Sequence, residues 1–225
     1  MLNVVCVQTD NYLGRGREYV ENLQRAVSEH LTVPYRFVCV TDDYGVNVDT
    51  CIPPKFKGWW EKIRLFQPGL FDDRVMFLDL DTLILKNIDH IAAYDGPFAT
   101  LEDFWRAGRL GPAVMLFDPQ YTCSVYMDWE AQGFPMQGNG DQTWLDNLDQ
   151  GRFRKNADKL QNLFPGEFVS YKEHCTAGRR SWRNINDQLP PPDKARVVCF
   201  HGRPRVHECG GWVADTWNQL EVAYG

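Results

Sequence analysis

The stretch Val75-Met76-Phe77-Leu78-Asp79-Leu80-Asp81-Thr82 decides the fold, because it is an unbroken apolar run that ends in two carboxylates. Such a run predicts a strand that is buried on both faces. In open α/β sheets, ligands bind at the carboxyl ends of these strands, where Asp79 and Asp81 lie. Residues two apart on a strand point the same way, so the two carboxylates converge. Carboxylate oxygens suit Mg²⁺ or Mn²⁺, and the pair therefore predicts a divalent metal site that holds a phosphate-bearing substrate.

The elements on either side of this run predict an α/β fold. Strand, helix, strand and helix patterns precede it in turn, and this alternation favours a mostly parallel sheet with helices on its faces. The chain of 225 residues is long enough for one sizeable domain. Strands are expected over residues 2–7, 35–40, 75–82, 113–117, 168–171 and 196–200, helices over residues 18–29, 59–66, 121–131 and 141–148, and a proline-rich loop over residues 51–58.

Composition and charge narrow the function. The formal net charge of -6 gives no global reason to bind nucleic acid or an anionic membrane. A locally basic stretch over residues 151–192 leaves an anionic acceptor, nucleic acid included, open but not favoured. The seven cysteines are odd in number and scattered without a Cys-x-x-Cys pair, which predicts reduced thiols in a cytoplasmic protein. No apolar run reaches the length of a membrane span, and no signal peptide is expected.

A second charged cluster follows the strand that is expected over residues 196–200. It consists of His201, Arg203, Arg205 and His207, and Gly202 and Pro204 within it indicate a shaped loop rather than a solvated turn. Arginine side chains neutralise phosphate oxygens, and carboxylates hold the cation that bridges those oxygens. The acidic pair and the basic loop together fit a metal-bound diphosphate.

An apolar strand followed by Asp-x-Asp is also how haloacid-dehalogenase-type phosphatases begin. In such a phosphatase Asp79 would be the nucleophile and Asp81 the general acid. Two features of the sequence weigh against this reading. Two strand–helix units precede the acidic pair, whereas these phosphatases usually open with it, and we find no convincing later acidic pair with a lysine.

Six motifs, in the right order along almost the whole chain, resemble those of GT-A-fold glycosyltransferases. The similarity is greatest to the glycogenin and bacterial galactosyltransferase group, family eight. Each motif is loose by itself, and the ordered set is more specific. The motifs are the first-strand loop at residues 7–12, the helix at 59–65, the metal strand and its continuation at 77–89, the strand under the transferred sugar at 111–117, the acid–amide pair at 140–142, and the diphosphate loop at 201–205.

The resemblance implies a hexosyltransferase that moves a sugar from a UDP-sugar, with Mn²⁺ or Mg²⁺ and with retention of configuration. Residues 1–110 would form the nucleotide-binding half of a single domain, and residues 111–225 the sugar and acceptor half. By this resemblance, Asp79, Asp81 and His201 would hold the metal, Asp141 and Gln142 would lie beside the reacting carbon, Thr9, Asp10 and Tyr12 would contact the base, and Lys62, Leu80, Asp103, Gly202, Arg203 and Arg205 would contact the rest of the donor.

The sequence departs from the family pattern around Gly202. The family has a metal-binding histidine three residues before this glycine and a lysine three after it, where this chain has Cys199 and Arg205. Arg205 can still bind phosphate, but thiolate is a soft ligand that suits Mn²⁺ poorly. His201 shares a strand face with Cys199 and is expected to take its place as third ligand.

Three questions stay open at the level of sequence. The family's Asn-Ser-Gly before Val114 is replaced by Gly-Pro-Ala, which leaves the donor sugar undefined. Asp141 reads almost equally well as a helix N-cap. A non-catalytic nucleotide-sugar-binding module is an alternative to the enzyme, and the acceptor could be a glycan, a lipid-linked sugar or another molecule.

Overall fold

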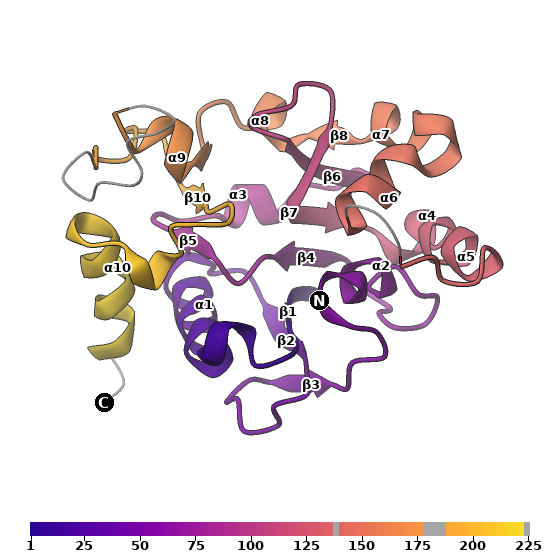
Figure 1. The fold of residues 1–225 in the computed structure, drawn as a ribbon, viewed down its shortest axis with the longest axis horizontal. Helices are drawn as coiled ribbons and strands as arrows, with labels where there is room; N and C mark the ends of the chain where they lie inside the picture. The colour runs from indigo at the N-terminus through magenta and orange to yellow at the C-terminus, as the bar shows by residue number, and fades with distance from the viewer. Residues whose placement is uncertain (137–139, 178–187, 223–225) are drawn as a thin grey trace.

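The central sheet is built outward from β1 (Leu2–Gln8), which pairs in parallel with β2 (Tyr35–Thr41) on one side and β4 (Val75–Leu78) on the other. The computed structural model describes residues 1–136, 140–177 and 188–222. Its main sheet has seven strands in the order β3-β2-β1-β4-β7-β6-β8 (Figure 1). Four of its six strand pairs are parallel, as predicted, and β7 is antiparallel to both of its neighbours. The remaining strands of this sheet are β3 (Thr50–Ile52), β6 (Phe98–Glu102), β7 (Leu110–Phe117) and β8 (Asp158–Lys159).

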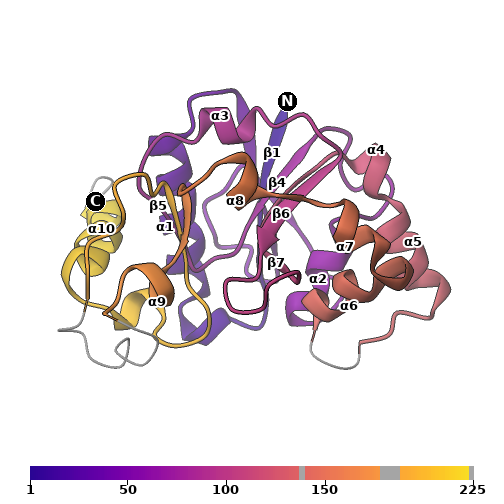
Figure 2. The ribbon, with the colours of Figure 1, turned by 90° about the horizontal axis from the view of Figure 1, so that it is seen from above.

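Alternate residues of the central strands belong to two separate cores, because side chains alternate between the faces of a sheet. Val4 packs in the core that contains α1 (Gly16–His30), whereas Val5 packs in the core that contains α2 (Glu61–Arg64) and α5 (Ser124–Ala131). Figure 2 shows these helices on opposite sides of the sheet. Both faces of these strands are buried, so successive residues must all be apolar, which explains the unbroken runs. Each buried valine or leucine side chain stabilises the fold by about 1.5–3 kcal/mol.

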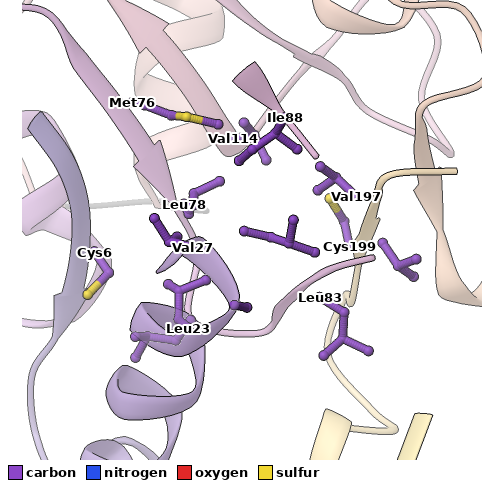
Figure 3. Close-up of a cluster of buried hydrophobic side chains, with 14 of the residues drawn as sticks. Cys6, Leu23, Val27, Met76, Leu78, Leu83, Ile88, Val114, Val197 and Cys199 are labelled. Atoms are coloured by element: carbon purple, nitrogen blue, oxygen red, sulfur yellow. The ribbon is translucent and has the colours of Figure 1, made fainter. Parts of the chain in front are cut away.

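A second, three-stranded sheet covers the core on the α1 side. Its order is β5-β10-β9, formed by β5 (Thr82–Ile84), β9 (Phe168–Ser170) and β10 (Val197–Cys199). Figure 3 shows Leu83 and Cys199 of this sheet lying in one apolar cluster with side chains of α1 and β4. Strand β10 thereby brings the loop after it beside the turn after β4, although the two are more than a hundred residues apart in sequence.

Most of the predicted elements are confirmed, with boundaries that differ by a few residues. The helix over residues 59–66 is a 3₁₀ turn that leads into α2, and the helix over residues 121–131 is split in two. The short helices α3 (Asp89–Ala92), α7 (Arg152–Asn156), α8 (Leu160–Leu163) and α9 (Tyr171–His174) have no strong local pattern and were not predicted. The other helices are α4 (Pro119–Thr122), α6 (Asp141–Asn147) and α10 (Gly211–Val222).

Two predictions about local structure are wrong. The strand expected over residues 75–82 ends at Leu78, and Asp79 to Asp81 form a turn between the two sheets. The backbone N–H of Asp79 still bonds to the Ala113 carbonyl at 2.8 Å, after which the chain turns to pair with β10. The rule that residues two apart share a strand face therefore does not apply to the acidic pair. The loop expected over residues 51–58 begins instead with two residues of β3, which pairs with β2.

All seven cysteines are free thiols, and four of them are buried, as expected from their places in apolar runs. Among the described residues, none of the helices is both long and apolar enough to cross a membrane.

Asp89 joins α3 to the segment after α1, and it provides a test of the fold. Its carboxylate accepts hydrogen bonds from the Thr32 backbone N–H at 2.7 Å, from the Thr32 hydroxyl, and from Asn87 Nδ2 at 2.9 Å. These bonds, with that of Asn87 the largest cause, lower the pKa of Asp89 to about 2. An unfolded aspartate has a pKa of about 3.9, so this contribution to stability is complete above that pH and is lost as pH falls through about 2.

We therefore expect Asp89→Asn to lower the free energy of unfolding at pH 7, and to lower it less as the pH is reduced. Urea denaturation at pH 7, 4 and 3 measures the difference from wild type. Exposed Asp72 supplies the matched control, Asp72→Asn, which should change stability little at any of these pH values. A difference for Asp89→Asn that is constant from pH 7 to pH 3 would contradict the role given to the carboxylate.

Candidate active site

A cavity of about 250 Å³ lies at the carboxyl end of β4, where the turn after β4 meets β7, α6 and the loop after β10. This is the sheet edge at which the sequence predicted a ligand. The volume is close to the roughly 300 Å³ at the lower limit of small-molecule sites, so it suits one sugar ring better than a whole nucleotide-sugar. Six of the predicted site residues line it: Lys62, Asp79, Asp103, Asp141, Gln142 and His201.

Lys62 holds two carboxylates together at the floor of this cavity. Its Nζ lies 2.7 Å from Asp79 Oδ1 and 3.6 Å from Asp141 Oδ2. Burial acts to lower the pKa of Lys62, but the charges of Asp141 and Asp79 outweigh it and raise the pKa above the usual lysine value. The lysine is therefore a firmly charged ammonium that joins α2, the turn after β4 and the start of α6.

Asp79 is the residue of this group with the most altered acidity. Burial raises the pKa of Asp79 to about 7, against the opposing effect of the Lys62 ammonium and with the support of the nearby Asp81 charge. Near neutral pH the carboxyl is thus shared between its protonated and ionised forms. A cation bound beside it would favour the ionised form, which is the form that binds metals.

Asp81 is the meeting point of three segments that are distant in sequence. Its Oδ2 accepts a hydrogen bond from Tyr12 Oη at 3.2 Å and from Arg205 Nη1 at 2.7 Å. Arg205 Nη1 also donates to Tyr12 Oη at 3.1 Å, and these two residues are 193 positions apart. The loop after β1, the turn after β4 and the loop after β10 are therefore held together at this one carboxylate.

His201, rather than Cys199, reaches the cavity. Cys199 is the last residue of β10 and its side chain is buried in the core, where burial raises its pKa and keeps the thiol protonated. His201 lies beyond the end of the strand, so the expectation that the two share a strand face is wrong. Its Nε2 is buried and has no hydrogen-bond partner among the described residues, and burial lowers its pKa. A neutral imidazole with an unpaired nitrogen is the form that binds metals.

Two carboxylates and a neutral imidazole form a donor set that suits Mn²⁺ or Mg²⁺. Within residues 1–136, 140–177 and 188–222, however, no three His, Cys, Asp or Glu side chains are close enough together to hold a metal ion. Asp79 is engaged by Lys62 and Asp81 by Arg205. The residues fit a divalent cation by their chemistry, with the unpaired nitrogen of His201 as the available third donor atom.

Asp103 and Gln142 both line the cavity and form a hydrogen-bonded pair. Gln142 Nε2 donates to Asp103 Oδ2 at 2.8 Å and to the Leu110 carbonyl at 2.5 Å. Burial acts to raise the pKa of Asp103, but hydrogen bonds from the Trp105 N–H, Gln142 and Arg106 outweigh it and leave the pKa below the usual value. Asp103 is therefore an ionised acceptor that can bind sugar hydroxyl groups.

The start of α6 positions Asp141 and Gln142. Gly140, with a left-handed φ of 89°, is the N-cap, and Asp141 is the first residue of the helix. The interpretation of Asp141 as the cap is therefore wrong, and its carboxylate pairs with Lys62 instead. One turn later, Asp146 accepts a hydrogen bond from the Leu110 N–H at 2.9 Å and fixes the helix against β7.

The other predicted residues are not among those that line the cavity. Thr9 is half-buried, and the N–H of exposed Asp10 donates to Asp42 Oδ2 at 3.4 Å. Arg203 is exposed and lies 3.6 Å from Glu208. The Leu80 side chain belongs to the core, so only its backbone could contact a donor.

Sequence reasoning missed the aromatic wall of the cavity, formed by Phe104 and Trp105. Both rings lie against His201, with centroids 5.3 and 5.7 Å from the imidazole. An aromatic pair directly after Asp103 is the signal that could have indicated it, had β6 been predicted. Part of the basic stretch, including Arg179, Arg180 and Arg183, lies outside the described residues.

No protein-family model matches the sequence, and comparison with curated proteins found no match. Comparison with solved structures found strong similarity of fold. The galactosyltransferase LgtC, solved in complex with donor and acceptor sugar analogues, matches with a TM-score of 0.66 and 14% identity, over 98% of this chain and 95% of LgtC. The glycosyltransferase GlyE of Streptococcus pneumoniae TIGR4 matches with a TM-score of 0.67 and 14% identity.

The bifunctional glycosyltransferase WbbM matches with a TM-score of 0.70 and 12% identity. This chain spans 60% of the GlyE chain and 49% of the WbbM chain, in each case over 98% of its own length. At these identities the comparison defines the fold alone. The fold of this chain is that of the GT-A glycosyltransferases.

Proposed function

We propose that this protein is a metal-dependent glycosyltransferase that moves a sugar from a UDP-sugar to an acceptor hydroxyl, with retention of configuration. The observation that carries the proposal is the convergence of Asp79, Asp141 and Gln142 on one sugar-sized cavity, with Asp81 and Arg205 paired beside it. Within a GT-A fold, this is the edge of the sheet at which a nucleotide-sugar would bind.

Asp79, Asp81 and His201 would hold the Mn²⁺ or Mg²⁺ ion, which would neutralise charge on the leaving diphosphate. Arg205 and Lys62 add positive charge on two sides of the acidic pair. In the same scheme, Thr9, Asp10 and Tyr12 contact the base. Residues 1–110 then supply the nucleotide side and residues 111–225 most of the sugar and acceptor side.

Asp103 and Gln142 orient the sugar through its hydroxyl groups, since they form one hydrogen-bonded pair on the cavity wall. Asp141, which pairs with Lys62 in the cavity lining, stabilises positive charge that develops at the reacting carbon. Phe104 and Trp105 close the side next to His201 and exclude water from it. The Gly-Pro-Ala segment of β7 offers no side-chain hydrogen bond to the sugar, which is one reason that the donor sugar needs to be found by experiment.

The acceptor is proposed to be a glycan or a lipid-linked sugar. The structure of LgtC was determined with an acceptor sugar analogue, and the shared fold supports an acceptor of the same class here. The net charge of -6 still gives no general attraction to nucleic acid.

A screen of UDP release over a panel of nucleotide-sugars, with Mn²⁺ present, tests the proposal directly. We expect slow metal-dependent hydrolysis of one or a few UDP-sugars even without acceptor, and loss of this activity with a chelator. Tight binding of UDP without any turnover, with or without candidate acceptors, would favour the non-catalytic binding module. Phosphate release from an aryl phosphate would favour the phosphatase. The similarity of fold to glycosyltransferases makes this the less favoured alternative.

The choice between His201 and Cys199 as third metal ligand gives a second prediction. His201→Ala should raise the Mn²⁺ concentration needed for half-maximal UDP release by at least about 10–100-fold, because a ligand itself is lost and even the loss of a ligand's outer hydrogen-bond partner costs that much. Cys199→Ser is the control, and it should leave the Mn²⁺ requirement within about twofold, since the thiol lies in the core. Manganese titrations of both variants make the comparison. The reverse result, with the larger effect for Cys199→Ser, would move the ligand back to the cysteine.

A further inference from the structure

Lys172 is a buried lysine at the edge of the candidate active site that sequence reasoning gave no role. It is the second residue of α9, and only 6% of its surface is exposed. Its Nζ donates a hydrogen bond to the backbone carbonyl of His201 and lies 5.1 Å from the centre of the Trp105 ring. Both of these contacts are with residues that line the cavity.

A second cation, Arg205, belongs to the loop that Lys172 contacts. Burial lowers the pKa of Lys172, and the positive charge of Arg205 acts in the same direction. Lys172 Nζ lies beside Gly202, and Arg205 follows that glycine by three residues, so the two positive charges repel each other near one turn. An anion bound between them would remove this repulsion and would gain from both charges.

Gly202 keeps the space beside this lysine open. Its backbone is left-handed, with φ of 65°, and a β-carbon added there would have Lys172 Nζ as its nearest neighbour, 4.0 Å away. A glycine lets a ligand approach the backbone closely. The ammonium thus lies beside a residue without a side chain, next to two residues that line the cavity and on the loop that carries Arg205.

We propose that Lys172 binds the diphosphate of the donor and of the nucleoside diphosphate product, together with Arg205. This inference rests on the proposed function and adds to it a second cationic group that contacts the leaving group. The bond to the His201 carbonyl keeps the ammonium beside the diphosphate loop, and a cation–π contact with the Trp105 ring adds to its positioning. Lys172 is on this view a binding residue, and it need not exchange a proton.

The test is a calorimetric titration of the full chain with UDP and with uridine, at constant Mn²⁺. Lys172→Gln keeps a hydrogen-bond donor for the His201 carbonyl but removes the charge, whereas Lys172→Arg keeps the charge. We expect Lys172→Gln to raise the Kd for UDP by about tenfold or more, because a charged hydrogen bond to phosphate is lost. The Kd for uridine should stay within about twofold, and Lys172→Arg should bind UDP within about threefold of wild type.

Lys194 supplies the matched control, because it is an exposed lysine. It precedes β10, whereas His201 and the loop that Lys172 contacts follow that strand. Lys194→Gln should bind UDP as wild type does. If Lys172→Gln folds poorly, Lys172→Met removes the charge with an apolar side chain of similar length, and the same outcomes apply.

The outcomes separate the two proposals. A wild-type chain that binds neither UDP nor any other nucleoside diphosphate overturns the proposed function, and the role of Lys172 with it. A wild-type chain that binds UDP, with a charge-free variant that binds it equally well, overturns the role of Lys172 alone. Equal losses for UDP and uridine would show that the lysine only supports the loop, and would also overturn the assignment.

Discussion

Replacement of Asp81 by asparagine is expected to reduce metal-dependent UDP release by a factor on the order of 10³. The side chain is 9% exposed and lies where the segments that carry Tyr12, Asp81 and Arg205 meet. Asparagine can still accept the hydrogen bonds of Tyr12 and Arg205, so these segments should stay together. The variant loses the negative charge that would hold the cation. It therefore also loses the cation's effect on the leaving diphosphate.

Two measurements accompany this variant. Thermal unfolding should show a midpoint within a few degrees of wild type, which separates loss of charge from loss of fold. Asp72→Asn, at an exposed position, should keep full activity. Undiminished UDP release by Asp81→Asn, with the metal removed by a chelator, would contradict both the metal site and the role of this carboxylate.

Replacement of Lys62 by methionine is expected to have the second largest effect, and it should act on stability as well as on activity. The ammonium is the shared counterion of Asp79 and Asp141. Removing one partner of a buried ion pair costs about 3–5 kcal/mol, because the other charge is left without compensation. The side chain of Asp79 is 26% exposed to the cavity, so water reduces the cost to about 2–3 kcal/mol.

The pH dependence of this loss follows from the acidity of Asp79. Its folded-state pKa of about 7 is above that of an unfolded aspartate, so the native state loses stability as pH rises towards 7 and the carboxyl ionises. Without the ammonium this pKa rises further, because an opposing charge is gone. The destabilisation of Lys62→Met should therefore be greatest above pH 7 and small near pH 4.

Urea denaturation of wild type and Lys62→Met between pH 4 and pH 9 measures this difference. Lys194→Met, which changes an exposed lysine, is the control and should show no such trend. Manganese should stabilise Lys62→Met at pH 8, since the ion would supply the missing positive charge. A variant as stable as wild type over the whole range would show that the bridge at the cavity floor contributes nothing to the fold.

The apolar runs in the sequence are enough to predict the central strands, because burial on both faces requires an unbroken hydrophobic pattern. They also explain why the acidic pair could be placed at the carboxyl edge of a sheet. The short helices after residue 150 and the strand β6 were missed, since segments of a few residues have no complete period to detect. The same limit hid Phe104 and Trp105, which follow β6 directly.

The sequence by itself determined the class of fold, the position of the acidic pair and its partnership with the basic loop around Gly202. These depend on local pattern and on the order of elements along the chain. Only the tertiary structure decided that Asp79 to Asp81 form a turn, that Cys199 is a core residue, and that Lys172 contacts the loop after β10. Each of these depends on β10, which pairs with β5 and β9. Pairing between strands so distant in sequence depends on the packing of the whole domain, and no local window of the sequence contains it.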